Sequence, residues 1–173
     1  MERELLAQRI KEAAYLEGEF TLRSGRKSNY YLDKYLFETQ PDILKALGAL
    51  FATHIGSETT LVAGAELGGV SLAAVTSLES GIPFVIIRNK MKDYGTGKPF
   101  EGKLESGASV LLVEDIATSG GQVLEAAKVI VEHGAKVEKI VAVIDRQEGA
   151  RENIEGAGFG FASLFTKQDL GIG

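Results

Sequence analysis

From Thr60 onward, short apolar runs alternate with longer segments whose apolar residues recur at helical spacing. The apolar runs predict strands over 61–63, 83–87, 110–113, 139–144 and 159–164. Helical patterns over 70–80 and 122–133 separate several of these runs, and Gly134 stands where a helix commonly ends. This alternation is typical of a parallel sheet with helices on both faces. We therefore predict an α/β fold with a mostly parallel twisted sheet flanked by helices.

The N-terminal part of the chain has a different pattern and predicts a small hood, about residues 1–40, on a core of about residues 41–173. Apolar residues at helical spacing indicate a first helix that ends before Gly18, and Thr39 and Pro41 indicate the start of a second helix. Segments 20–22 and 30–32 are expected to be short strands on either side of a turn-rich stretch. The 173 residues show no internal repeat or interdomain linker, so we expect a single domain.

Composition argues against several classes of protein. A formal net charge of −5 does not suit a general nucleic-acid surface, which needs an excess of Lys and Arg. No apolar stretch has the length of a membrane span, and residues 1–4 do not begin a signal peptide, so we expect a cytoplasmic protein without a nucleic-acid or membrane partner. With no cysteine and only His54 and His133, there is little material for a thiolate nucleophile, a Ser–His triad or a histidine-rich metal site.

Unusual polar segments follow four of the predicted strands. In open parallel sheets, ligands bind beyond the carboxyl ends of the strands, because these ends meet at one edge of the sheet. The four segments are therefore expected to converge on one crevice. They span residues 64–69, 88–95, 114–122 and 145–148.

The segment from Glu114 to Gln122 is the most informative of the four. Two carboxylates, Glu114 and Asp115, precede small hydroxyl and glycine residues that open a helix. The small residues allow backbone N–H groups to close around a phosphate at the positive end of the helix. The carboxylates can accept hydrogen bonds from ribose hydroxyls. This segment therefore suits both halves of a ribose 5-phosphate.

Each remaining segment has a functional and a purely structural interpretation. The basic stretch 88–103 is either a loop that folds over a polyphosphate or a solvated surface loop. Segment 64–69 is a phosphate cradle, a tight turn, or both. Arg146 either pairs with its neighbour Asp145 or offers a planar fork to a substrate carboxylate.

Several of these segments resemble one enzyme family. Residues 110–122 match the motif with which the type I phosphoribosyltransferases bind 5-phosphoribosyl 1-pyrophosphate (PRPP). Segments 20–28, 88–102 and 145–149 are similar to those of one branch, the orotate phosphoribosyltransferases. The resemblance covers nearly the whole chain and implies the type I phosphoribosyltransferase fold.

The resemblance also implies roles for individual residues. Lys92 and Asp115 would be catalytic. The residues that would bind PRPP are Arg88, Asn89, Lys92, Tyr94, Glu114, Asp115, Ile116, Ala117, Thr118, Ser119, Gly120, Gly121 and Gln122. Those that would bind orotate are Arg23, Tyr30, Tyr31, Thr118 and Arg146. The implied cofactor is Mg²⁺, held mainly by the substrate on the side of Asp115, and the implied partner is a second copy of the chain that shares loop residues.

The family reaction joins N1 of orotate to C1 of the ribose and releases pyrophosphate, giving orotidine 5′-phosphate in pyrimidine biosynthesis. As the bond to pyrophosphate breaks, positive charge builds on the ribose and negative charge on the leaving group. Loop cations and Mg²⁺ therefore help most in the transition state. The reaction needs no protein nucleophile, which agrees with a chain that has no cysteine.

The chain also departs from the commonest family pattern, which leaves other functions open. Asn89 and Tyr94 stand where the loop usually has Lys and His, and Gly68 stands where some members have Lys. Lys90 is a candidate substitute for the missing loop cation. The alternatives are a phosphoribosyltransferase for another base and a non-catalytic protein that senses PRPP.

Overall fold

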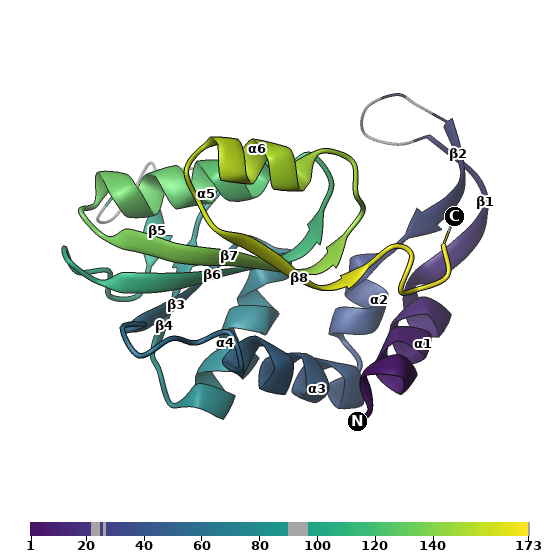
Figure 1. Cartoon of the computed structure of the whole chain (residues 1–173), viewed down its shortest axis with the longest axis horizontal. Coiled ribbons are helices and arrows are strands. Elements are labelled where there is room, and N and C mark those ends of the chain that lie inside the picture. Colours follow the sequence, from purple (N-terminus) through teal and green to yellow (C-terminus); the bar gives the residue numbers. More distant parts are fainter. Residues whose placement is uncertain (22–24, 26, 90–96, 173) are drawn as a thin grey trace.

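The computed structural model describes residues 1–21, 25, 27–89 and 97–172 of the chain. At its centre lies a six-stranded sheet in the order β5-β4-β3-β6-β7-β8, shown in Figure 1. Its strands are β3 (Leu61–Ala65), β4 (Phe84–Ile87), β5 (Phe100–Glu101), β6 (Ser109–Ala117), β7 (Lys136–Asp145) and β8 (Phe161–Thr166). All neighbours pair in parallel except β4 and β5. The predicted mostly parallel sheet is therefore confirmed.

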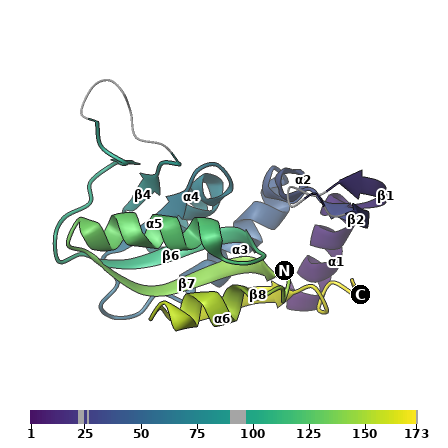
Figure 2. The ribbon, with the colours of Figure 1, turned by 90° about the horizontal axis from the view of Figure 1, so that it is seen from above.

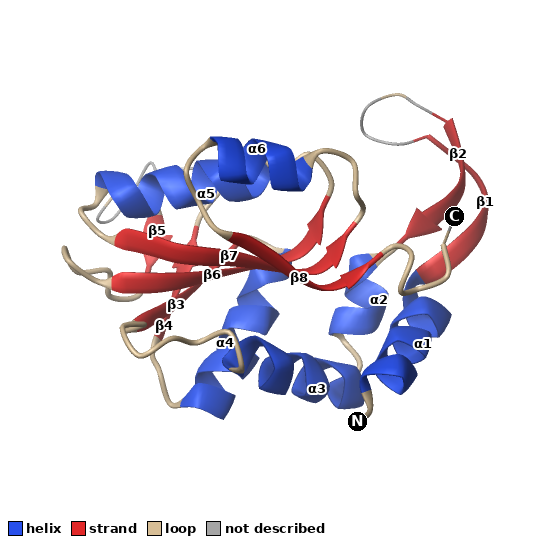
Figure 3. Cartoon of the chain, viewed as in Figure 1, coloured by secondary structure: helices blue, strands red, loops and turns tan. Residues whose placement is uncertain are grey.

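Helices cover both faces of this sheet (Figures 1 and 2). On one face lie α3 (Pro41–Ala52) and α4 (Gly68–Ser80), and on the other lie α5 (Gly121–Glu132) and α6 (Ala150–Gly156). The N-terminal part supplies α1 (Arg3–Ala14), β1 (Tyr15–Thr21), β2 (Lys27–Leu32) and α2 (Lys34–Glu38). β1 and β2 form a separate antiparallel sheet, which projects from the body of the molecule in Figure 3.

Strand β6 is buried on both faces because helices cover the sheet on each side. Leu111 and Val113 belong to the cluster under α3 and α4, whereas Val110 and Leu112 belong to the cluster under α5. Successive side chains of a strand point to opposite faces, so an unbroken apolar run is what a doubly covered strand requires. The carboxyl end of β6 is fixed in place by this packing.

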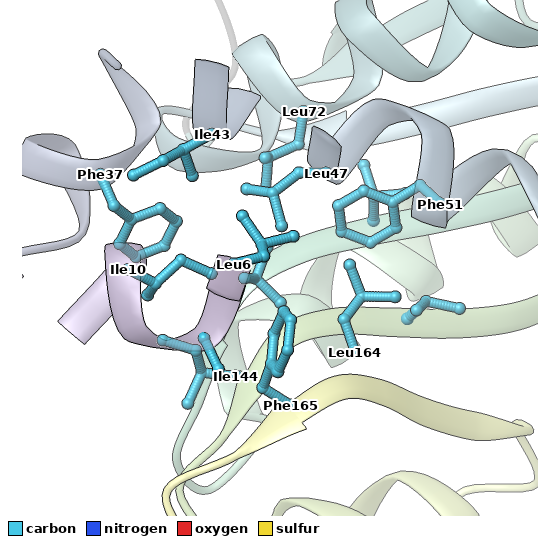
Figure 4. Close-up of a cluster of buried hydrophobic side chains, with 14 of the residues drawn as sticks. Leu6, Ile10, Phe37, Ile43, Leu47, Phe51, Leu72, Ile144, Leu164 and Phe165 are labelled. Atoms are coloured by element: carbon cyan, nitrogen blue, oxygen red, sulfur yellow. The ribbon is translucent and has the colours of Figure 1, made fainter. Parts of the chain in front are cut away.

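The helix of the predicted hood packs into the main core (Figure 4). Leu6 and Ile10 of α1 lie in one cluster with Phe37 of α2, Leu47 of α3 and Phe165 of β8. These side chains are at most 1% exposed. The division into hood and core stays a prediction, and β1 and β2 are the part of residues 1–40 that forms its own sheet.

Three elements go beyond the sequence prediction, and several strand boundaries differ from it, since β1 begins at Tyr15, β2 at Lys27 and β7 at Lys136. α2, β5 and α6 are only 5, 2 and 7 residues long, too short to produce a clear hydrophobic period. Glu114 and Asp115 were expected to follow a strand, but they lie inside β6, which stays paired with β7 as far as Ala117. Both carboxylates are thus held by the sheet itself.

Among the described residues, no helix is long and apolar enough to cross a membrane.

Leu47→Ala tests the core between α1, α3 and the sheet. Because Leu47 is fully buried, its truncation is expected to lower the free energy of unfolding by about 2–5 kcal/mol. Leu78→Ala on α4 is the matched control, since Leu78 is 84% exposed, and should change it by less than about 0.5 kcal/mol. Chemical denaturation measures both, and equal losses would contradict this assignment of the core.

Candidate active site

The turn between β6 and α5 leaves the start of α5 open to an anion. Gly120 adopts a φ of +78°, and a Cβ there would lie 3.0 Å from Cγ1 of Ile154, so glycine suits both its conformation and its space. The side chain of Asn153 holds the turn by donating to the carbonyl of Ser119 at 2.8 Å. No side chain caps the N-terminus of α5 among the described residues. Its first N–H groups and the helix dipole therefore favour a phosphate at this end.

This turn borders a cavity of about 530 Å³ at the carboxyl end of β6. The cavity brings together most of the predicted site residues that the structure describes. Its lining consists of Tyr31, Leu32, Lys34, Glu114, Asp115, Ile116, Ala117, Thr118, Ser119, Gly120, Gly121, Gln122, Val123 and Arg146. Carboxylates, a helix N-terminus and an arginine therefore share one hollow.

Asp115 is the most firmly held carboxylate of the cavity. Its Oδ2 lies 2.6 Å from Nζ of Lys34, and its Oδ1 accepts a hydrogen bond from the backbone N–H of Ile116. The Asp115 side chain is 3% exposed and that of Lys34 is 28% exposed. A Cβ at Gly68 would collide with Oδ2 of Asp115, so the start of α4 must be glycine to admit the carboxylate in this position.

Two further buried carboxyl groups lie near this ion pair. Burial, reinforced by the charge of Asp115, raises the pKa of Glu114 well above its usual range and that of Glu38 to about 8. Burial alone would lower the pKa of Lys34, but the charge and hydrogen bond of Asp115 outweigh it and raise that pKa. Glu38 Oε1 and Glu114 Oε2 have no hydrogen-bond partner among the described residues. The cluster is therefore most stable when Glu38 and Glu114 hold their protons.

A second cavity of about 600 Å³ adjoins the first across Gly121 and Gln122 and is lined by Arg88 and Asn89. Nη1 of Arg88 lies 3.2 Å from Glu101 and 3.6 Å from Glu66. The backbone N–H of Asn89 donates to Oε2 of Glu66 at 3.1 Å.

Glu66 also ties this second cavity to the start of α5. The Gln122 amide donates to the Glu66 carbonyl at 3.0 Å and to Oδ1 of Asn89 at 3.4 Å. These contacts link the segments that follow β3 and β4 to the start of α5. Four predicted PRPP residues, Arg88, Asn89, Gly121 and Gln122, are thus brought together.

Arg146 joins the cavity to the N-terminal hairpin. Its Nη2 donates to the hydroxyl of Tyr30 at 3.1 Å, and its Nε lies 3.1 Å from Oε1 of Glu148. The carboxylate of Asp145 instead accepts from the backbone N–H of Gln147 at 2.7 Å. The partner of Arg146 is therefore Glu148 and not Asp145, which corrects the ion-pair interpretation drawn from the sequence. The guanidinium is only 12% exposed, yet it lines the cavity.

The remaining predicted site residues have different outcomes. Tyr31 lines the cavity, and its ring packs against Phe20 at 5.6 Å. Arg23, Lys92 and Tyr94, as well as Lys90, lie outside the described residues.

Sequence reasoning missed Lys34 and Glu66. The available signal for α2 was Asp33, a residue type that favours the N-cap position. In the structure its side chain accepts from the N–H of Tyr35. Lys34 and Glu38, one turn apart, then share the polar face of this helix. Glu66 lies within the predicted cradle segment 64–69, but spacing alone does not indicate its contacts with Arg88 and Asn89.

Comparison with known proteins identifies the class that this fold and site define. The family profile described as "Phosphoribosyl transferase domain" matches residues 37–167. This range contains the whole six-stranded sheet and both carboxylates of β6. The class is therefore that of the phosphoribosyltransferases.

Comparison with individual relatives identifies the family within this class. The orotate phosphoribosyltransferase of Halobacterium salinarum is 48% identical over 88% of this chain and 87% of its own length. That of Pyrococcus abyssi is 46% identical over 98% of this chain and 95% of its own. The crystal structure of orotate phosphoribosyltransferase from Mycobacterium tuberculosis in complex with PRPP has a TM-score of 0.83 and 28% identity, covering 98% of this chain and 99% of that chain. The chain belongs to the orotate phosphoribosyltransferase family.

Glu38→Gln tests the buried carboxyl cluster through its pH dependence. Glu38 has a pKa of about 8 in the folded protein, above that of an unfolded glutamate, so it stabilises the fold fully below about pH 4.5 and loses this contribution as the pH rises through about 8. The melting temperature of Glu38→Gln should therefore rise relative to wild type between about pH 5 and pH 9. Glu4→Gln, on the exposed surface of α1, controls for the loss of a carboxylate. A constant difference between Glu38→Gln and wild type would contradict the assignment.

Proposed function

We propose that the crevice transfers the phosphoribosyl group of PRPP to N1 of orotate, giving orotidine 5′-phosphate and pyrophosphate in pyrimidine biosynthesis. This proposal is based on a single cavity that holds the carboxylates of β6, Arg146 and the N-terminus of α5, which no described side chain caps. Membership of the orotate phosphoribosyltransferase family supports the same substrates.

The phosphate end of PRPP would bind at the turn between β6 and α5. Residues 118–122 line the cavity there, and Thr118 and Ser119 are exposed. Backbone N–H groups from this turn can surround the phosphate oxygens, with hydroxyls of Thr118 and Ser119 beside them. Ile116 and Ala117 are the last residues of β6, and the turn begins directly after them.

The ribose and the leaving group would lie between the two cavities. Glu114 and Asp115 would accept the ribose hydroxyls, which makes Asp115 the residue next to the developing positive charge on the sugar. Pyrophosphate would leave toward Arg88, Asn89 and the segment after them. Lys92 and Tyr94 of that segment are proposed to bind it, with Lys92 acting in catalysis by balancing the charge of the leaving group.

Orotate would be recognised by its carboxylate. Arg146 presents five N–H donors in a planar fork, which suits bidentate binding of a carboxylate. Tyr31 and Thr118 line the same cavity, and Tyr30 orients the guanidinium through its hydroxyl. Arg23 completes the proposed orotate site.

The proposal further includes Mg²⁺, a homodimer and a cytoplasmic location. Among the described residues, no group of three or more His, Asp and Glu side chains is arranged to hold a metal ion. We propose a Mg²⁺ that PRPP oxygens would mainly hold, on the side of Asp115. When bound, Mg²⁺ neutralises negative charge on the departing pyrophosphate. The segment with Lys92 is proposed to act partly in the partner's site.

Turnover of orotate tests the function, and Arg146 tests the choice of base. Wild type should consume orotate in the presence of PRPP and Mg²⁺, followed by orotate absorbance. Arg146→Gln is expected to raise KM for orotate by about tenfold or more, the effect of losing hydrogen bonds between charged groups, with a smaller change in KM for PRPP. Arg151→Gln, which removes an exposed arginine paired with Glu155, is the control.

Three outcomes would contradict this proposal. PRPP binding without turnover would indicate a sensor, and faster turnover of a base that lacks a carboxylate would indicate another phosphoribosyltransferase. An unchanged KM for orotate in Arg146→Gln would remove Arg146 from the base site.

A further inference from the structure

Lys34 meets the catalytic carboxylate inside the substrate cavity. It is the first residue of α2, and the carboxylate of Asp33 caps this helix by accepting from the N–H of Tyr35. Its ammonium lies 2.6 Å from Oδ2 of Asp115, and both residues line the cavity that holds the turn before α5. The contact joins the N-terminal segment to the central strand.

The two oxygens of Asp115 contact different partners. Oδ1 is held by the backbone N–H of Ile116, which belongs to the same strand. Oδ2 is held by Lys34 and lies against the start of α4, where a Cβ at Gly68 would collide with it. Loss of Lys34 would remove the ammonium that contacts Oδ2.

Lys34 also stands next to buried negative groups. Glu38 is one helical turn further along α2 and is 4% exposed, and Glu114 precedes Asp115 and is 7% exposed. Ser71 of α4 donates weakly to Oε2 of Glu38 at 3.4 Å. The ammonium of Lys34 places one positive charge among these buried carboxyl groups.

We propose that Lys34 is a positioning residue for the reaction: it holds the Asp115 carboxylate in the orientation that accepts the ribose hydroxyls of PRPP. This inference rests on the proposed function, because it assigns Asp115 to the ribose. It predicts that Lys34 acts on the phosphoribosyl half of the substrate and leaves the base half unaffected. The Lys34 side chain is 28% exposed and lines the cavity.

The test compares Lys34→Met, Lys34→Arg and the control Lys45→Met, which removes an exposed lysine from α3. Lys34→Met should raise KM and Kd for PRPP about tenfold, the effect of one hydrogen bond between charged groups, and change KM for orotate less than about twofold. Lys34→Arg should restore most of the PRPP affinity, and Lys45→Met should match wild type. Thermal unfolding checks that each variant is folded, and Lys34→Gln replaces Lys34→Met if that variant is not.

Calorimetric titration with PRPP and Mg²⁺ separates this inference from the proposed function. If wild type turns orotate over and Lys34→Met binds PRPP as tightly as wild type, the positioning role is wrong while the function stands. Tighter binding by Lys34→Met would likewise overturn it, because Lys34 would then block the site. If wild type fails to turn orotate over, the Kd for PRPP still decides the role of Lys34.

Discussion

The positions of the other groups in the candidate site depend on the parallel pairing of β6 with β7. The pairing continues from Ser109 to Ala117, so the two carboxylates are strand residues with their backbone fixed on a buried sheet. Two apolar clusters hold the strand from both faces. The turn that follows then begins α5 at a set place, which puts its N–H groups beside those carboxylates. The extent of this pairing thereby fixes where the two carboxylates lie relative to the start of α5.

Charge balance is the second constraint on this arrangement. Buried carboxyl groups are costly when ionised, and here burial raises the pKa of both Glu38 and Glu114. Asp115 has instead an ammonium at 2.6 Å and a backbone N–H. A similar balance operates at the other end of the crevice, where Arg146 contacts Glu148 and Tyr30. Asp115 and Arg146 are therefore each oriented by other protein groups.

The sequence predicted the sheet well because its strands are compact apolar runs, such as the one from Val110 to Val113. It placed the end of β6 too early, because Glu114 and Asp115 are polar and resemble the start of a loop. The short elements α2, β5 and α6 could not be predicted because they are too short to show a hydrophobic period. Without α2, the position of Lys34 could not be predicted either. The partner of Arg146 was also missed, since the backbone beyond β7 turns Asp145 toward the N–H of Gln147. Such contacts depend on side-chain directions that spacing along the chain does not encode.

A crystal structure with orotidine 5′-phosphate bound tests the central claim most directly. The account predicts the 5′-phosphate on the backbone N–H groups of residues 118–122, the ribose hydroxyls on Glu114 and Asp115, and the base carboxylate on Arg146. A phosphate bound elsewhere, or a base carboxylate that does not contact Arg146, would contradict the account.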